Sequence, residues 1–277
     1  MKFDLHCHSY FSDGTLSPSQ LIDHAIDSGV THLALTDHDT VSGLESAVLA
    51  ASKSDLTLIP GVEFSCLWQH QLLHIVGLSV DQENSFMLDG IQSNTDRRFE
   101  RAEKMYQDFE RNDIDLRSDV QTQIAGKGVP TRPHFAQALV NQGYAKNKKQ
   151  AFKRYLIKGK VGYIPMQWPS LEQVANWINQ AGGVAVLAHP MRYKFTRSRL
   201  IRLIEEMTSV GVRGMEVSTP INDNQQIEML TRLALDYDLL ASIGSDFHSP
   251  DQPWARLGTA VPLANELTPV WTEFNHA

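Results

Sequence analysis

Short apolar runs of the length of buried strands recur along this chain, and most of them lead directly into histidine, aspartate or glutamate. The runs cover residues 2–5, 30–35, 56–64, 72–80, 184–188, 214–217 and 240–243, and helical patterns separate several of them at 18–28, 43–52, 198–209 and 224–237. Strands that alternate with helices pair in parallel, and the carboxyl ends of parallel strands meet at one face. The sequence therefore predicts a barrel-like α/β fold of seven strands with a polar site at that face.

The middle of the chain breaks this alternation. From about residue 84 to residue 180 the pattern is helical, polar and strongly charged. Between Arg97 and Lys160 there are 15 Lys/Arg and 7 Asp/Glu, a net of +8, whereas the whole chain carries −7 and the remainder therefore −15. We interpret residues 84–180 as an inserted helical, basic subdomain that recognises substrate, in a barrel built from 1–83 and 181–277. A merely solvated helical face is the plainer alternative.

Composition excludes several classes of protein. A net charge of −7 argues against a passive nucleic-acid coat, and no stretch approaches the roughly 20 apolar residues of a membrane span. The first residues lack the apolar run of a signal peptide, and two cysteines, Cys7 and Cys66, favour a reducing cytoplasm over a disulfide framework. Neither a Gly-rich Lys-Ser/Thr phosphate loop nor a G-x-S-x-G elbow is present.

The candidate site residues follow the strands. His6 and His8 alternate at the end of the first strand and can point to one side, although a His-x-His pair alone is a weak signal. Asp13 follows in a Ser-Asp-Gly turn, where the glycine lets the chain bend the carboxylate inward. The remaining candidates are His38 in Thr-Asp-His-Asp, Glu63, His74, His189, Asp246 and His248. Taken alone, His74 between Leu73 and Ile75 is more often a core histidine.

Imidazole and carboxylate without thiolate suit manganese, zinc or iron, and so many candidate ligands predict more than one ion. Such a site polarises a phosphoryl oxygen, generates hydroxide from water and stabilises the leaving oxygen. The residues therefore predict a site of more than one metal ion that can act on a phosphoester.

Five motifs in this order resemble the PHP (polymerase and histidinol phosphatase) superfamily. They are HCHSYFSDG at 6–14, TDHD at 36–39, GVEFS at 61–65, LAHP at 187–190 and GSDFH at 244–248. Two further segments, TRPHFAQALV at 131–140 and the run at 159–190, resemble the stand-alone bacterial branch of 3',5'-nucleoside-bisphosphate phosphatases and 5'-to-3' exoribonucleases. The resemblance implies a distorted seven-stranded barrel with a helical insertion. It also implies up to three metal ions, for which manganese is the first candidate.

The resemblance also implies roles for individual residues. One ion would be held by His6, His8, Glu63 and Asp246, a second by Asp13, His38 and His248, and a third by Glu63, His74 and His189. Asp13, Glu63, Asp246 and His248 would be the catalytic set. Arg132 and His134 would face substrate phosphate, with His134 either a phosphate contact or a ligand, and Lys158 and Lys160 would add charge.

The implied reaction is hydrolysis of the 3' phosphoester of nucleoside 3',5'-bisphosphates, of short 5'-phosphorylated RNA, or of both. Two alternatives remain: a phosphatase of a histidinol-phosphate-like metabolite, and a non-catalytic module stapled by metal. The basic segment favours a substrate with a second phosphate, and hence the nucleotide reading. We expect no DNA duplex, membrane or obligate protein partner.

Overall fold

The computed structural model describes residues 1–124 and 128–274. The strands are β1 (Phe3–Cys7), β2 (His32–Leu35), β3 (Thr57–Trp68), β4 (Gln71–Leu78), β5 (Val184–Leu187), β6 (Gly214–Ser218) and β7 (Leu240–Ile243). The α-helices are α1 (Pro18–Asp27), α2 (Leu44–Ala51), α3 (Ser85–Glu110), α4 (Arg117–Ile124), α5 (Arg132–Asn141), α6 (Lys148–Ala151), α7 (Leu171–Gln180), α8 (Arg197–Ser209) and α9 (Asn224–Asp236). A π-helical turn covers Phe152–Leu156, and short 3-10 turns cover Pro190–Tyr193 and Val270–Glu273. The predicted α/β class is confirmed.

The seven strands form one sheet in the order β1 to β7, and its two ends meet. Cys7 at the end of β1 bridges Phe247, which follows β7, in parallel register. His8 N donates to Phe247 O at 2.9 Å, and Asp246 N donates to His6 O at 2.8 Å. These bonds bring the first and last strands together at their carboxyl ends, where the polar motifs lie.

The prediction of parallel pairing is wrong for β4, which runs antiparallel to both β3 and β5. β3 does not end near Glu63 but continues to Trp68, and a two-residue turn leads back into β4. Gln69 and His70 in that turn have φ values of 46° and 65°, which matches the twist of a tight hairpin. A connection this short leaves no room for the helical crossover that a parallel pair needs.

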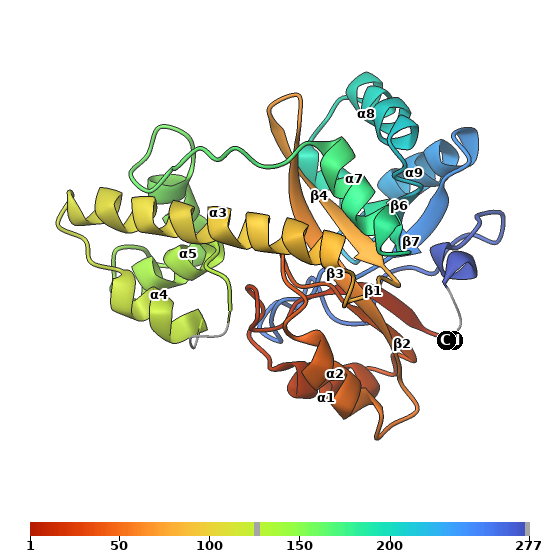
Figure 1. Cartoon of the computed structure of the whole chain (residues 1–277), viewed down its shortest axis with the longest axis horizontal. Coiled ribbons are helices and arrows are strands. Elements are labelled where there is room, and N and C mark those ends of the chain that lie inside the picture. Colours follow the sequence, from red (N-terminus) through yellow and green to blue (C-terminus); the bar gives the residue numbers. More distant parts are fainter. Residues whose placement is uncertain (125–127, 275–277) are drawn as a thin grey trace.

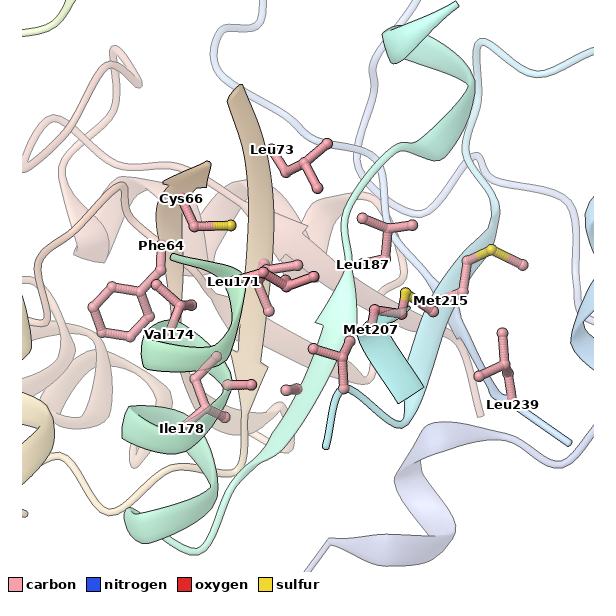
Figure 2. Packing of buried hydrophobic residues seen from close by; sticks show 14 of the residues in the cluster. Phe64, Cys66, Leu73, Leu171, Val174, Ile178, Leu187, Met207, Met215 and Leu239 are labelled. Carbon is pink, nitrogen blue, oxygen red and sulfur yellow. The ribbon is translucent and has the colours of Figure 1, made fainter. Parts of the chain in front are cut away.

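Two layers of apolar side chains surround the sheet. Inside the barrel, side chains of β1 to β5 such as Leu5, Val76 and Val186 form one buried cluster. Outside, α7, α8 and α9 form one core with strands β3 to β7, and Figure 2 shows Val174 and Ile178 of α7 beside the strands there. Helices α1 and α2 pack on β1 and β2. No helix in the described part of the chain is long and apolar enough to cross a membrane.

A second hydrophobic core lies within the middle of the chain. It gathers buried residues from Ala102 to Leu156, with Phe109 and Phe135 at its centre. Figure 1 shows α3 running from the sheet out to α4 and α5, so that one helix joins the two cores. Helix α7, although part of the predicted 84–180 segment, packs with the sheet. The limits of the insertion stay a prediction.

The crossing of α3 and α7 depends on Gly90. A Cβ atom at this position would lie 2.4 Å from the Trp177 ring. Alanine in a helix is normally about 1 kcal/mol more favourable than glycine, yet here overpacking opposes that gain.

We expect Gly90→Ala to lower the free energy of unfolding by roughly 1–3 kcal/mol, measured by urea denaturation, because the new methyl group displaces Trp177. Gln92→Ala, on the exposed side of the same helix, is the matched control and should stay within about 0.5 kcal/mol of the wild type. An increase in the free energy of unfolding of Gly90→Ala would contradict this prediction, because it would show that α3 and α7 accommodate the methyl group without loss of packing.

Candidate metal centre

The nine residues predicted as metal ligands lie together at the carboxyl-end face of the barrel. They are His6, His8, Asp13, His38, Glu63, His74, His189, Asp246 and His248, and all are buried except His74 and His248, which are partly exposed. Seven of them lie in β1 or in the loops that follow β1, β2, β5 and β7. Glu63 and His74 instead lie within the β3–β4 hairpin, where Ser65, on the same face as Glu63, is opposite His74.

The Glu63 carboxylate is the centre of the group. Its Oε2 lies 2.9 Å from His38 Nδ1 and 3.3 Å from both His6 Nε2 and His8 Nε2. Its Oε1 lies 3.0 Å from His74 Nδ1 and 3.1 Å from His189 Nε2. One carboxylate thus faces five imidazoles.

Three sets of ligand atoms lie close enough together to hold a metal ion. They are His8 with Asp13, His38 and His248; His6 with His8 and Glu63; and His38 with Glu63 and His74. In the predicted assignment His8 and His38 each belonged to a single set. In the structure His8 belongs to the first and second of these sets, and His38 to the first and third. Asp246 remains close, with Oδ1 3.1 Å from His8 Nε2.

The side-chain atoms fit divalent cations. Asp13 Oδ1, His38 Nδ1, Glu63 Oε2 and His74 Nδ1 are buried and make no hydrogen bond of good geometry in the described structure, although each lies within 3.2 Å of a histidine nitrogen or a carboxylate oxygen of the cluster. Buried polar atoms rarely lack partners, and several converging nitrogen and oxygen atoms are the donor set of manganese, zinc or iron. The cluster therefore suits divalent metal ions.

The charge states of Glu63 and His38 fit metal binding. His6 and His248 must each lose a proton to bind an ion, because burial is outweighed by neighbouring carboxylates, which raise the pKa of both, to about 9 for His248. Burial alone would raise the pKa of Glu63, but the His38, His6 and His74 imidazoles hold it well below its ordinary range. Burial lowers the pKa of His38 to about 4, although Glu63 and Asp13 oppose it. An ionised carboxylate and a neutral imidazole are the forms that bind metal.

Glu216, on β6, is a buried residue that the sequence reasoning missed. Its Oε1 lies 2.6 Å from His6 Nδ1, and its Oε2 accepts from His189 N at 2.5 Å. A carboxylate behind an imidazole fixes the ring so that the opposite nitrogen points into the cluster. The signal was available, because an acid inside the apolar run Gly214–Ser218 is as unusual as Glu63 is in its own strand.

Asp37 holds the loop that carries Asp13. It accepts hydrogen bonds from Ser9 N at 2.8 Å, Ser9 Oγ at 2.6 Å and Ser12 Oγ at 2.6 Å. The Ser-Asp-Gly turn is therefore fixed against the end of β2. Asp13 Oδ1 then lies 3.2 Å from His248 Nε2.

Three residues at this face have left-handed backbone conformations although none is glycine. Asp39, His189 and Asp246 have φ values of 51°, 30° and 53°, and each lies just beyond a strand. Such conformations are unfavourable for side-chain-bearing residues and concentrate at functional sites. The backbone is thus bent where polar side chains must turn inward.

A pocket of about 200 Å³ opens beside the cluster, and we call it the arginine pocket. It is lined by Asp13, His38, His74 and His248 on the cluster side, and by Arg98, Arg101, Arg132, Trp168 and Arg192 among others. Arg101 is buried, and it has neither a hydrogen bond nor an ion pair within residues 1–124 and 128–274. Burial, followed by repulsion from Arg98 and Arg132, holds the pKa of Arg101 well below its ordinary value.

The predicted substrate contacts meet different outcomes. Arg132 lines the arginine pocket. His134 does not line it; its Nδ1 lies 3.1 Å from Thr131 N and caps the start of α5, and burial lowers its pKa to about 4. Lys158 and Lys160 are exposed and do not line this pocket.

Arg98, Arg101, Trp168 and Arg192 were not singled out from the sequence. Arg98 and Arg101 are one helical turn apart on α3, and both guanidinium groups lie 5.3 Å from the Trp168 ring. The i, i+3 spacing of the two arginines was visible. Apolar residues at helical spacing, such as Met87, Ile91, Ala102 and Met105, also marked the buried face of this helix, but polar residues interrupt them where Arg98 and Arg101 lie.

Comparison with known proteins agrees with this geometry. The family model of the PHP domain matches residues 4–183. The chain belongs to the PHP domain family.

Relatives of this PHP protein match along nearly its full length. A 5'-3' exoribonuclease from Haemophilus influenzae is 40% identical over 273 residues, 99% of each chain. A 3',5'-nucleoside bisphosphate phosphatase from Chromobacterium violaceum is 37% identical over 273 residues, 98% of this chain and 96% of that one. A solved structure described as a metal-dependent phosphoesterase, from Bifidobacterium adolescentis, superposes with a TM-score of 0.83 at 29% identity, covering 98% of this chain and 94% of that one.

The ion pair of Arg98 with Asp39 joins the insertion to this PHP barrel. Arg98 Nε donates to Asp39 Oδ2 at 2.7 Å, and Asn94 Nδ2 donates to Asp39 Oδ1 at 2.7 Å. Both members of the pair are at most 4% exposed. Breaking a buried pair leaves one charge without compensation.

We expect Arg98→Met to lower the free energy of unfolding by about 3–5 kcal/mol, since the Asp39 carboxylate stays buried without its cation. The double variant Arg98→Met/Asp39→Asn should recover part of this loss, and a double-mutant cycle by urea denaturation measures the coupling. If Arg98→Met lowers the free energy of unfolding by less than about 1 kcal/mol, the pair contributes no more than a surface salt bridge does, which would contradict this prediction.

Proposed function

We propose that this PHP protein is a metal-dependent phosphoesterase that hydrolyses the 3' phosphoester of nucleotides carrying a 5'-phosphate. The observation that carries the proposal is the contact between two opposite features: a cluster of His, Asp and Glu, and a pocket of arginines with an unpaired buried guanidinium. The names of the Haemophilus influenzae and Chromobacterium violaceum relatives, an exoribonuclease and a bisphosphate phosphatase, support the same substrate class.

In this proposal the nine clustered residues, Glu63 among them, would hold up to three divalent ions, of which manganese is the first candidate. Bound ions of this kind polarise a phosphoryl oxygen and lower the pKa of water. The chain's own residues do the rest. Glu216 fixes the ring of His6, Asp37 fixes the loop of Asp13, and Arg192 pairs with Asp246 at the edge of the arginine pocket.

The arginine pocket would hold the 5'-phosphate. A dianionic phosphate relieves the repulsion among Arg98, Arg101 and Arg132 and supplies the partner that Arg101 lacks. Arg132 can bind it in two-point fashion, and its guanidinium is already placed over Phe152 at 6.0 Å. The 5'-phosphate is therefore a handle, distinct from the phosphoester that is cut.

One bond cleavage serves both substrate types. Water oxygen bonds to phosphorus, the P–O3' bond breaks, and the 3' oxygen leaves as a hydroxyl after taking up a proton. A nucleoside 3',5'-bisphosphate then yields a nucleoside 5'-monophosphate and inorganic phosphate. A 5'-phosphorylated RNA yields the same type of monophosphate and a shorter RNA with a new 5'-phosphate, so the cycle can repeat.

We expect chelation to abolish hydrolysis and added manganese to restore it. Glu63→Gln should reduce turnover by more than roughly 100-fold. Loss of a residue that only orients a metal ligand costs up to about 100-fold, and the Glu63 carboxylate is itself a candidate ligand that faces five imidazoles. The measurement pairs the hydrolysis rate with the metal content of each preparation. Full activity in a verified metal-free preparation would contradict the proposal.

We expect the wild type to cut an RNA with a 5'-phosphate much faster than the same RNA with a 5'-hydroxyl. Arg132→Ala should shrink that difference by roughly 10- to 100-fold, because one charge-assisted phosphate contact of about 1.5–3 kcal/mol is lost. Lys158→Ala is the control and should leave the ratio unchanged, since Lys158 is exposed outside the pocket. Equal wild-type rates on both RNAs would favour the metabolite-phosphatase alternative.

A further inference from the structure

A second hollow begins at the same cluster and leads away from the arginine pocket. Its volume is about 330 Å³, and it shares Asp13, Pro133, Phe152, Arg192 and His248 with the arginine pocket. The rest of its lining is Thr15, Lys148, Asp246, Ser249, Gln252 and Trp254. We call it the downstream groove. A substrate held by its 5'-phosphate and cut at the cluster would continue in this direction if it continued at all.

Trp254 is the groove's most exposed large apolar side chain. Its surface is 59% accessible, and it lies in the loop that follows β7. Two backbone hydrogen bonds of 3.1 Å, from Gln252 N to Ser249 O and from Ala255 N to Gln252 O, fold this loop. The next residue, Ala255, is 1% exposed and anchors the chain. An indole ring is thus held in water beside the phosphoester site by an ordered loop.

The opposite wall belongs to the insertion. Phe152 opens the π-helical turn 152–156, a rare conformation that occurs often at functional sites, and it lines both hollows. Lys148 is half-buried and has no ion-pair partner within the described residues. Proteins bind single-stranded nucleic acid through a positively charged groove that follows the nucleic-acid backbone and through aromatic rings on which bases stack. The downstream groove offers an ammonium group and an indole ring.

We propose that the downstream groove holds the second nucleotide of a 5'-phosphorylated RNA, with its base stacked on Trp254. The inference rests on the proposed function and extends it, because it assigns a site that only an oligonucleotide can fill. A nucleoside 3',5'-bisphosphate ends at the phosphate that is cut, so it leaves the groove empty. Stacking on one ring tolerates any base, which suits an enzyme that shortens RNA nucleotide by nucleotide.

The test compares two substrates on the metal-loaded enzyme. Trp254→Ala should reduce kcat/KM for a 5'-phosphorylated dinucleotide by about 5- to 150-fold, the range for loss of one base–aromatic stack. Hydrolysis of the nucleoside 3',5'-bisphosphate should stay within twofold of wild type. Trp254→Phe should restore most of the dinucleotide activity, and Phe99→Ala, which removes an aromatic ring 47% exposed on α3 and outside both hollows, should change neither substrate.

A dinucleotide with an abasic second position completes the design. The wild type should process it about as slowly as Trp254→Ala processes the intact dinucleotide, and the variant should show no further loss. Equal losses on dinucleotide and bisphosphate, no loss on either, or a wild type indifferent to the missing base would each overturn the inference while the phosphoesterase proposal stands. A wild type that hydrolyses neither substrate contradicts the phosphoesterase proposal itself, and the inference falls with it.

Discussion

The buried carboxylate of Glu63 is the constraint on which the polar face depends. Its two oxygens lie within 3.3 Å of five histidine nitrogens, contributed by segments between residues 6 and 189. An ionised group at this depth is stable only if opposite charge or strong donors surround it. The curl of the sheet also brings β1 beside β7, so that His6 and His8 face a second buried carboxylate, Asp246, as well as Glu63. The imidazoles of one strand end thus compensate two negative charges.

The distance between the cluster and the arginine pocket is set by neighbouring residues of the backbone. His38 turns toward Glu63, and the next residue, Asp39, in a left-handed conformation, turns toward Arg98. Arg98 lies one helical turn from Arg101 on α3. The backbone and a buried ion pair thus join the arginine pocket to the cluster of candidate ligands. In the proposed function, this connection would set the spacing between the two phosphates of a substrate.

The nine candidate ligands could be picked out from the sequence because a polar residue at the end of an apolar strand needs an explanation. The structure brings these residues together, and their role as ligands stays a prediction. The same logic, applied to Glu216, would have found the residue behind His6. It failed for the β3–β4 hairpin, because Gln69 and His70 lack the Asn-Gly composition that marks a tight turn. It also missed Arg101, although Met87, Ile91, Ala102, Met105 and Phe109 form an apolar stripe on α3 and Arg101 directly precedes one of its members. Trp168 lies between two helices, where no periodicity tells which side faces the pocket. His134, predicted to contact phosphate or metal, also caps the start of its helix, a role that the sequence reasoning did not consider.

The net charge of the insertion and its recognition of anions are separate properties. Lysines such as Lys158 and Lys160 contribute to the +8 of the segment from Arg97 to Lys160, yet they are exposed outside the hollows. Exposed charges act over about 10 Å at moderate salt and raise the rate of encounter with an anion. Arg101 and Arg132 act at contact distance, where desolvation makes each guanidinium more dependent on a partner. The charge of a sequence segment therefore predicts that an anionic substrate is attracted to it. The position at which the phosphate of that substrate binds depends instead on which arginines the fold buries.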